Sequence, residues 1–399
     1  MKTAIVGGGA SGLMAAIYAA MGGSSVTVYE GAARCGRKIL ATGNGRCNMT
    51  NINAAIENYH GSDTSFMRGV ISRFWVAETL DAFESMGILP KTDDEGRVYP
   101  NSDQAASVLD VLRLRCEALG VETVTGFEVM EIKKRNSGFL LRSYKGGTAQ
   151  ADRVVIATGG RAAPDLGAKG GGYELLKKLG HHITELRPSL VQIKTAGDTA
   201  KKLKGMKFTG EARLGKHSRR GEILFTDTGL SGIPIFSLTS CYEGQREIVL
   251  DLMDKYSEDE VYTMLCMRAA NNPGTPLESY LTGMLNKRIG QVLMKENDIA
   301  PLSRKACTLS DGEIRRLAHV MKEWEFRVEG TMSWNNAQVT KGGALTSEFD
   351  PVTLESRLVN GIYAAGEVLD IDGDCGGYNL QWAWASGAVA GRCAARRSY

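Results

Sequence analysis

The opening residues combine two short apolar runs with one amphipathic segment between them. Ala4–Val6 is too short for a helix and suits a buried parallel strand. Apolar residues then recur at helical spacing from Leu13 to Ala20, and a β-branched run, Val26–Val28, follows. The pattern predicts a strand, a helix and a second strand, which is a βαβ unit of an α/β protein.

The next stretch continues with alternating helical and strand-like patterns. Residues 64–89 have helical periodicity. Within 97–120, Ser102 stands as an expected cap ahead of a helix whose apolar face is formed by Ala105, Val108, Leu109 and Leu112. Strand patterns follow, with a hairpin turn at Gly146-Gly147 and an apolar strand at Val154–Ile156.

The texture changes from about Pro188. Short strand-like runs predict a small β domain, and residues 257–298 look helical, with breaks at Pro273 and Pro276. Leu358–Ala365 has the pattern of another strand, and a final helix is expected from Leu380 onward. We therefore expect three parts along the chain, with strands of the same kind in the first and the last part.

Glycines at the end of the first strand have the spacing G-x-G-x-x-G. Gly7 allows the tight turn, Gly9 lets the backbone approach a pyrophosphate, and Gly12 lets the helix pack closely on the strand. Free N–H groups at the helix start then hold the phosphates. Glu30 ends the second strand, where its carboxylate can bond a ribose 2′-OH and would repel a 2′-phosphate. We interpret this unit as a dinucleotide site.

Residues 31–51 do not continue into a plain βα repeat. They are rich in glycine, asparagine, threonine and arginine, so we expect an extended loop of hydrogen-bonding groups. Its cations include Arg37, Lys38 and Arg46, and its neutral donors include Thr42, Asn44 and Asn48. Such a segment fits along a longer cofactor, beside a ribityl chain and a ring.

Composition narrows the protein class. The 399 residues favour two or three domains, and a hydrophobic share of 43% with 23% charged residues is ordinary for a globular enzyme. A net charge of +3 does not by itself indicate nucleic acid or an anionic membrane. No apolar window is long enough to span a membrane, and the chain starts directly in a strand, so we expect no leader peptide.

The eight cysteines form no C-x-x-C pair, which favours reduced thiols in a cytoplasm. Cys47, inside the glycine-rich loop, is expected to be a buried thiol, although it could face the ring of a cofactor. His181 and His182 are adjacent and cannot both point at one site from regular structure, so no metal is predicted.

Several long motifs resemble one family. GRKILATGNGRCNMTN, LFTDTGLSG, VTKGGA, ESRLVNGIYAAGEVLDIDG and GGYNLQWAWASG are similar to those of the HI0933-like bacterial flavoproteins, which include BaiN-type and aminoacetone-oxidase-type enzymes. The resemblance implies a discontinuous, Rossmann-like FAD domain of the glutathione-reductase type at 1–188 and 333–399. It also implies an inserted β-barrel-like domain at 189–255 and 308–332 and a small helical domain at 256–307.

The resemblance also implies which residues contact FAD. These residues extend from the pyrophosphate and ribose, along the adenosine and flavin, to the ribityl chain and the pyrimidine edge. They are Gly7, Gly9, Ala10, Ser11, Gly12, Glu30, Gly31, Arg37, Lys38, Val129, Thr42, Gly43, Asn44, Gly45, Cys47, Asn48, Ala157, Thr158, Gly159, Gly160, Gly366, Glu367, Gly377, Tyr378, Asn379 and Leu380. Val129 is expected to present its backbone to the adenine. No residue of the sequence is assigned as the catalytic acid or base.

The implied function is an FAD-dependent oxidoreductase that moves a hydride between flavin and a small organic substrate. NAD(P)H-dependent reduction of a conjugated C=C bond is favoured over O₂-dependent oxidation of a small amine. No second glycine fingerprint lies between residues 160 and 330, so NAD(P)H would dock transiently over the ring.

Two further readings stay open. A flavoprotein that binds flavin without catalysis is one. The other is an RNA-acting flavoprotein, because the inserted segment has a basic stretch, although such stretches more often mark a solvated face. Its members are Lys201, Lys202, Lys204, Lys207, Lys216, Arg219 and Arg220.

Overall fold

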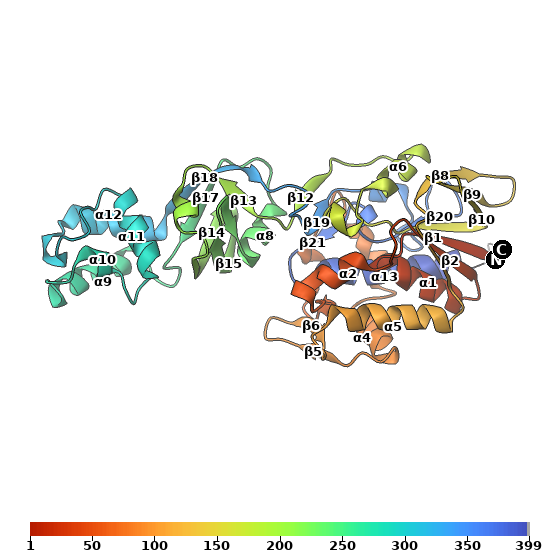
Figure 1. The fold of residues 1–399 in the computed structure, drawn as a ribbon, viewed down its shortest axis with the longest axis horizontal. Helices are drawn as coiled ribbons and strands as arrows, with labels where there is room; N and C mark the ends of the chain where they lie inside the picture. Colours follow the sequence, from red (N-terminus) through yellow and green to blue (C-terminus); the bar gives the residue numbers. More distant parts are fainter. Residues whose placement is uncertain (397–399) are drawn as a thin grey trace. The chain divides into compact units, whose positions relative to one another are not determined.

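The computed structural model describes residues 1–396, and these divide into two compact units. Unit 1 comprises residues 1–189 together with those from 337 onward, and unit 2 comprises residues 190–336. Each unit has its own hydrophobic core. Unit 1 is therefore discontinuous in sequence, and unit 2 is inserted between its two parts (Figure 1).

The main sheet of unit 1 is parallel and has the strand order β20-β11-β1-β2-β7. Its strands are β1 (Lys2–Val6), β2 (Ser25–Glu30), β7 (Glu122–Thr125), β11 (Arg153–Ile156) and β20 (Ile362–Ala364). Helix α1 (Ala10–Met21) connects β1 to the adjacent β2, which confirms the predicted βαβ unit. The last strand, β20, comes from the second part of the chain and pairs with β11.

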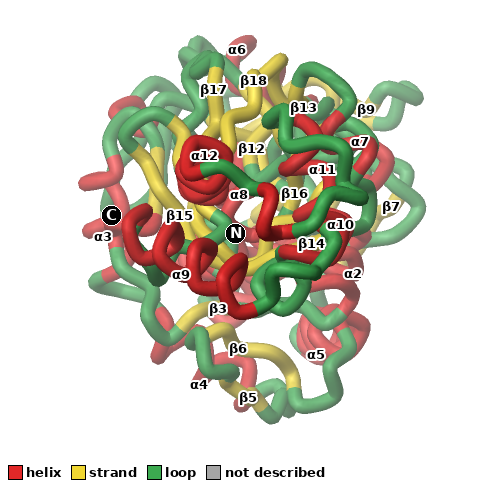
Figure 2. Tube along the Cα trace, turned by 90° about the vertical axis from the view of Figure 1, so that its left-hand side faces the viewer, coloured by secondary structure: helices red, strands yellow, loops and turns green. Residues whose placement is uncertain are grey.

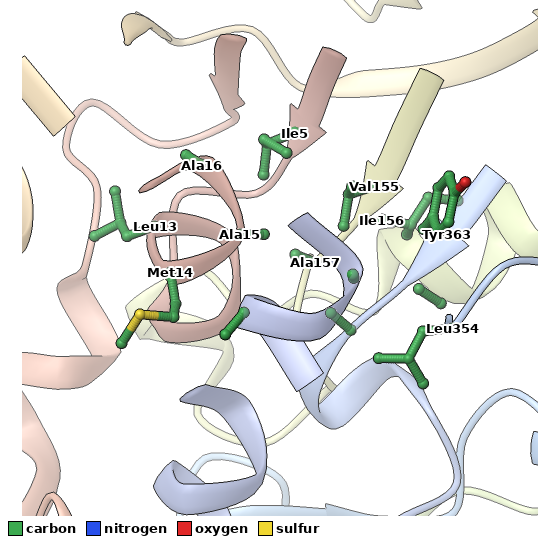
Figure 3. Packing of buried hydrophobic residues seen from close by; sticks show 14 of the residues in the cluster. Ile5, Leu13, Met14, Ala15, Ala16, Val155, Ile156, Ala157, Leu354 and Tyr363 are labelled. Atoms are coloured by element: carbon green, nitrogen blue, oxygen red, sulfur yellow. The ribbon is translucent and has the colours of Figure 1, made fainter. Parts of the chain in front are cut away.

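The core of unit 1 forms where α1 and α13 (Tyr378–Ala394) cover this sheet. Ile5 and Val155 of the sheet and Leu13 and Met14 of α1 are buried there (Figure 3). The two helices touch at their backbones, because a Cβ at Gly391 would lie 2.2 Å from the Ala15 carbonyl oxygen. This contact holds α13 against α1.

The remaining elements of unit 1 are short. The helices are α2 (Arg37–Ala41), α3 (Arg68–Ile71), α4 (Val76–Ser85), α5 (Ala105–Ala118) and α6 (Gly171–Lys178), with 3₁₀ turns at Thr42–Gly45, Ile56–Asn58, Thr64–Met67, Pro164–Leu166, Thr346–Glu348 and Gly366–Val368. The strands are β3 (Thr50–Asn51), β4 (Tyr59–His60), β5 (Pro90–Thr92), β6 (Arg97–Pro100), β8 (Val129–Lys134), β9 (Phe139–Ser143), β10 (Thr148–Ala151), β12 (Arg187–Ser189), β19 (Val339–Lys341) and β21 (Asp372–Gly373).

Three local predictions differ from the structure. Residues 31–51 are not extended throughout, because α2 and a 3₁₀ turn form within them. The helical stretch 64–89 is interrupted before α4, where the Trp75 N–H donates to the Glu78 carboxylate at 2.8 Å and starts a new helix. Ser102 does not cap α5; Gln104 is at that position, and the Ser102 hydroxyl donates to the Ser107 hydroxyl instead.

Unit 2 contains a closed barrel with the strand order β13-β16-β15-β14-β17-β18, which confirms the expected β-barrel-like fold. The strands are β13 (Ile193–Thr195), β14 (Lys207–Leu214), β15 (His217–Phe225), β16 (Gly229–Ser231), β17 (Glu247–Asp251) and β18 (Trp324–Thr331). The helices are α7 (Thr199–Lys202), α8 (Ile233–Thr239), α9 (Glu258–Asn271), α10 (Leu277–Tyr280), α11 (Lys287–Glu296) and α12 (Asp311–Lys322), with a 3₁₀ turn at Ala306–Thr308.

Helices α9 and α12 lie side by side in unit 2 (Figure 2). One hydrophobic cluster includes barrel residues such as Phe225 and helix residues such as Leu265 and Leu317. The barrel and the helices therefore share a core, and the predicted boundaries between them stay a prediction.

Candidate cofactor site

Three parallel strands of unit 1 end at the same edge of the sheet. The turns after β1, β11 and β20 touch one another there: a Cβ at Gly7 would lie 2.5 Å from the Ala157 carbonyl oxygen, and one at Gly366 would lie 2.5 Å from the Ser11 hydroxyl oxygen. Ligands of open parallel sheets bind outside the carboxyl ends of the strands. The predicted residues at 7–12, 157–160 and 366–367 are thus brought together.

The glycine fingerprint has the geometry that an anion site requires. Gly7 has a φ of +104°, which suits glycine. A Cβ on Gly12 would lie 1.9 Å from the Gly7 carbonyl oxygen, whereas one on Gly9 would meet nothing within 4 Å. Gly9 begins α1 without a side-chain cap, and the first turn holds no acidic residue. The helix N–H groups are left for an outside acceptor.

Glu30 holds the loops on either side of the nucleotide turn. Its carboxylate accepts the Gly8 N–H at 2.8 Å and the Ala32 N–H at 2.7 Å. Each oxygen keeps a further lone pair for a ribose hydroxyl. The Phe127 N–H donates to the Glu30 carbonyl at 2.9 Å, which places the segment leading to Val129 beside the same strand end.

The structure joins Lys38 to Glu367. The Lys38 ammonium lies 2.8 Å from the Glu367 carboxylate, whereas the family resemblance implied that Lys38 flanks the adenosine end and that Glu367 bonds the ribityl chain or a nearby phosphate. The second oxygen of Glu367 accepts the Thr340 N–H at 2.8 Å. The Thr340 hydroxyl in turn accepts the Arg161 N–H at 2.7 Å, so this group holds the 157–161 turn in place. Arg37 donates to the Asp165 carbonyl at 2.7 Å.

The glycine-rich loop has a left-handed backbone at several positions. Gly43, Asn44 and Gly45 all have positive φ, and so does Cys47. Cys47 is fully buried, and burial raises the pKa of its thiol to about 12, so it stays protonated at neutral pH. The Arg46 guanidinium lies 4.5 Å from the centre of the Tyr99 ring. The loop therefore combines a left-handed backbone with a buried, protonated thiol.

The amino end of α13 is also uncapped. Gly377 has a φ of +100° and gives no side-chain cap. The side chain of Asn379 is already used, since its amide donates to the Gly373 carbonyl at 2.7 Å and accepts the Gly373 N–H at 2.8 Å. The Tyr59 hydroxyl donates to the Tyr378 carbonyl at 3.0 Å. This end of the helix therefore offers a ligand the backbone N–H groups of residues 378–380.

Several of the buried polar atoms without a hydrogen-bond partner lie around this helix end. Within residues 1–396 they include the Asn48 Oδ1, the Gln381 Nε2 and both carboxylate oxygens of Asp372. The other amide atom of Gln381 is satisfied, because its Oε1 accepts the Thr50 hydroxyl at 2.7 Å. An unpartnered buried polar atom costs about 1–3 kcal/mol, so such a group of atoms indicates a polar ligand.

Together these residues fit FAD. Two uncapped helix ends, a ribose-binding acid and unpartnered donors and acceptors match the pyrophosphate, the ribose and the polar edge of a flavin. Sequence reasoning did not find Thr340, Asp372 or Gln381, although all three lie in or beside motifs that carried the family resemblance. Nothing in the local pattern shows that their side chains are buried.

The parallel sheet, its glycine turn and this donor set define a flavoenzyme with a Rossmann-type FAD domain, an FAD-dependent oxidoreductase. The chain belongs to the HI0933-like family, because the family description "HI0933-like protein Rossmann domain" matches residues 1–393.

Curated relatives cover nearly the whole chain. A 3-dehydro-bile acid delta(4,6)-reductase from Clostridium scindens is 38% identical over 99% of this chain and 99% of its own. A ribosomal RNA dihydrouridine synthase from Escherichia coli is 30% identical over 96% of this chain and 95% of its own. The protein of the same description from Haemophilus influenzae is 28% identical over 96% of this chain and 95% of its own.

Among solved structures, the FrdA subunit of E. coli quinol fumarate reductase matches 99% of this chain and 70% of its own, with a TM-score of 0.50 and 17% identity. At this level the likeness concerns the fold alone. None of the helices formed by residues 1–396 combines the length and the apolarity that a membrane span requires.

Proposed function

We propose that this protein catalyses the NAD(P)H-dependent reduction of a conjugated C=C bond in a small organic substrate. The observation that carries the proposal is the 38% identity, over 99% of both chains, with a 3-dehydro-bile acid delta(4,6)-reductase. The site supports it, because the residues around the strand ends suit a bound FAD.

The chain's residues supply binding and orientation in this reaction. When bound, FAD supplies the transfer of a hydride. The amino end of α1 would hold the pyrophosphate, with Gly9 giving it close access, and Glu30 would bond the ribose. The amino end of α13 would place positive helix-dipole charge and N–H groups beside the pyrimidine edge, where they stabilise negative charge.

NAD(P)H is proposed to dock transiently, since the sequence offers only one nucleotide fingerprint. We also propose a reducing cytoplasm as the place of action. All eight cysteines are free thiols, and the buried ones such as Cys47 and Cys116 have raised pKa values because of burial. Free, protonated thiols persist in a reducing compartment.

An anaerobic two-step mixing experiment tests the proposal. The holoenzyme is mixed with NADPH or NADH, and the visible flavin band is followed. A panel of conjugated enones, including a 3-dehydro-4,6-diene bile acid, is then added without air. We expect the nicotinamide to bleach the band and an enone to restore it. Bleaching by a small amine alone, with recovery only in air, would instead indicate amine oxidation and contradict the proposal.

A second candidate is reduction of uracil in ribosomal RNA, because two relatives are described as ribosomal RNA dihydrouridine synthases. The charge pattern of unit 2 weighs against it. Four cations of its basic stretch are engaged in ion pairs with carboxylates, which weakens their attraction for phosphates. The pairs are Lys202 with Asp198 and Glu296, Lys204 with Asp227, Lys207 with Glu222, and Arg220 with Asp254.

Binding to transcripts of bacterial ribosomal RNA at increasing salt separates the two candidates. For a small-molecule reductase we expect no retention even at low ionic strength. Retention that falls steeply with salt, together with dihydrouridine in RNA incubated with NADPH, would favour the RNA candidate. The control is a transfer RNA of similar charge density, which tests whether any retention depends on the RNA itself.

A further inference from the structure

Asp372 is a buried acid whose carboxyl group has no hydrogen-bond partner within the described residues. It is 1% exposed, and neither of its oxygens has a hydrogen-bond partner within residues 1–396. Asp372 lies on β21, between the turn that carries Glu367 and the start of α13. The adjacent Gly373 is clamped through both its N–H and its carbonyl by the Asn379 amide, so the backbone position is fixed.

The nearby Asp370 shows how the same chain treats a structural carboxylate. It is 3% exposed, but the Ser62 N–H donates to its Oδ2 at 3.1 Å and the Ser62 hydroxyl also donates to it. Asp374, on the other side, lies 2.9 Å from the His60 imidazole. Asp372 stands between two partnered acids and has no such partner, so its isolation is particular to that residue.

Burial is the main influence on the charge of Asp372, and it raises the pKa of this carboxyl to about 7. His60 on β4 and Lys341 on β19 lower the pKa of Asp372, whereas the carboxylates of Asp370 and Glu367 raise it. Phenols of α6, β4 and α13 lie in the same neighbourhood. The groups around Asp372 are His60, Lys341, Glu367, Asp370, Tyr59, Tyr173 and Tyr378.

A buried carboxyl without partners is unfavourable as a carboxylate, because nothing replaces the water that it loses. As a neutral acid it is a hydrogen-bond donor, and the fold gives it no acceptor. Asn48 and Gln381, two further residues with an unpartnered buried atom, also lie at the start of α13 or beside it. The acceptor for Asp372 is therefore expected to arrive with the ligands of this site.

We propose that Asp372 is the proton donor in the reduction of the C=C bond. This inference rests on the proposed function. Reduction adds a hydride to one carbon and a proton to the other, and FAD, when bound, would supply the hydride at the expense of NAD(P)H. The O–H bond of the Asp372 carboxyl breaks as the second C–H bond forms. The carboxylate that remains takes up a proton from water before the next turnover, so atoms and charge balance.

The first test is infrared difference spectroscopy of the holoenzyme without substrate. Titration from pH 5.5 to 8.5 follows the carbonyl stretch of a protonated carboxyl group. We expect a band that disappears near pH 7 in the wild type and is missing in Asp372→Asn. The matched control, Asp374→Asn, should keep the band. A wild-type protein without any carboxyl band that titrates in this range overturns the proposal, even if the Asn variant fails to fold.

The second test separates the two halves of the reaction by rapid mixing. In Asp372→Asn we expect reoxidation by an enone to slow by about 10²-fold, the usual contribution of a general acid, and to slow far more than reduction by NADPH does. In the wild type, reoxidation should slow as the pH rises through 7, because the donor loses its proton, and the variant should lack this dependence.

Equal slowing of both halves would make Asp372 a cofactor-binding group and overturn its role as the donor. An unchanged rate and pH profile of reoxidation would do the same. If no enone reoxidises even the wild type, the proposed function fails instead, and the infrared titration still decides whether Asp372 holds a proton at neutral pH. The failures of the two proposals are therefore distinguishable.

Discussion

Three helices of unit 2 and two helices of unit 1 begin in different ways. In unit 2, α9, α11 and α12 start at Ser257, Asn286 and Ser310, and each of these side chains accepts a backbone N–H of its own helix. In unit 1, α1 and α13 start at Gly9 and Gly377, which have no side chain to give. Every helix leaves N–H groups without partners at its start. These three helices of unit 2 satisfy some of their own N–H groups, whereas α1 and α13 of unit 1 leave theirs to a ligand.

Side chains show the same contrast. In unit 2, Arg304 donates to both oxygens of Glu313, at 2.8 and 3.1 Å, and the Ser310 N–H donates to the same carboxylate. In unit 1, Gln381 and Asp372 are buried with atoms that have no partner within residues 1–396. A site prepared for a ligand costs stability while it is empty and regains it when the ligand binds.

The largest expected effect comes from Gly12→Ala, compared with Gly9→Ala. A Cβ on Gly12 would collide with the Gly7 carbonyl, whereas one on Gly9 would meet nothing within 4 Å. We expect Gly12→Ala to lower the free energy of unfolding by about 3 kcal/mol and to abolish FAD binding. Gly9→Ala should leave the apoprotein's stability unchanged and weaken FAD binding by about tenfold, or about 1.4 kcal/mol.

Chemical denaturation of the apoproteins and fluorescence titration with FAD measure both effects. If Gly9→Ala binds FAD as tightly as the wild type, the open space beside Gly9 is not where the pyrophosphate lies. Equal stability of the two variants would contradict the close approach of α1 to β1.

Asn48→Ala tests the unpartnered group in the loop. Its Oδ1 makes no hydrogen bond within the described residues, so the apoprotein should lose little stability, while FAD binding should weaken by about 1–2 kcal/mol. Asn53→Ala is the matched control, because Asn53 is exposed on the same segment. Titration calorimetry with FAD compares the two. A large loss of stability with unchanged affinity would make Asn48 an ordinary structural residue.

Glu313→Gln addresses the satisfied network of unit 2, with an expected cost of about 1–2 kcal/mol and no effect on FAD binding. The Arg304 guanidinium lowers the pKa of Glu313 from 4.5 to about 2. A lowered pKa means that the ionised acid stabilises the fold above about pH 4.5 and loses this contribution as the pH falls to about 2. The stability difference between wild type and variant should therefore shrink over that range in denaturation at several pH values.

The smallest effect is expected for Ser257→Ala at the start of α9. Ser257 accepts the Glu260 N–H, and its loss should cost about 1 kcal/mol. FAD affinity should not change, because the cap lies in unit 2. Thermal unfolding of the holoprotein and FAD titration measure the two quantities. A change in affinity would show that helix capping in unit 2 is not independent of the cofactor site.

Local sequence pattern predicted the elements that depend on local spacing. The βαβ unit formed as expected, and so did the buried face of α5, with Val108, Leu109 and Leu112 inside. Predictions failed where a neighbour competes. Gln104 rather than Ser102 precedes α5, and residues 31–51 contain α2 because Ile39 is buried in the core of unit 1. The predictions of the cap at Ser102 and of the loop at 31–51 failed because local pattern carries no information about packing.

The sequence by itself determined the glycine turn, the acid at Glu30 and the class of fold, because each follows from residues close together in the chain. Only the tertiary structure decided the partners of distant residues. Lys38 meets Glu367 across 329 positions, Thr50 meets Gln381 across 331, and Asp372 meets no partner. Burial and partnership depend on which segments the fold brings together, and that information is not local.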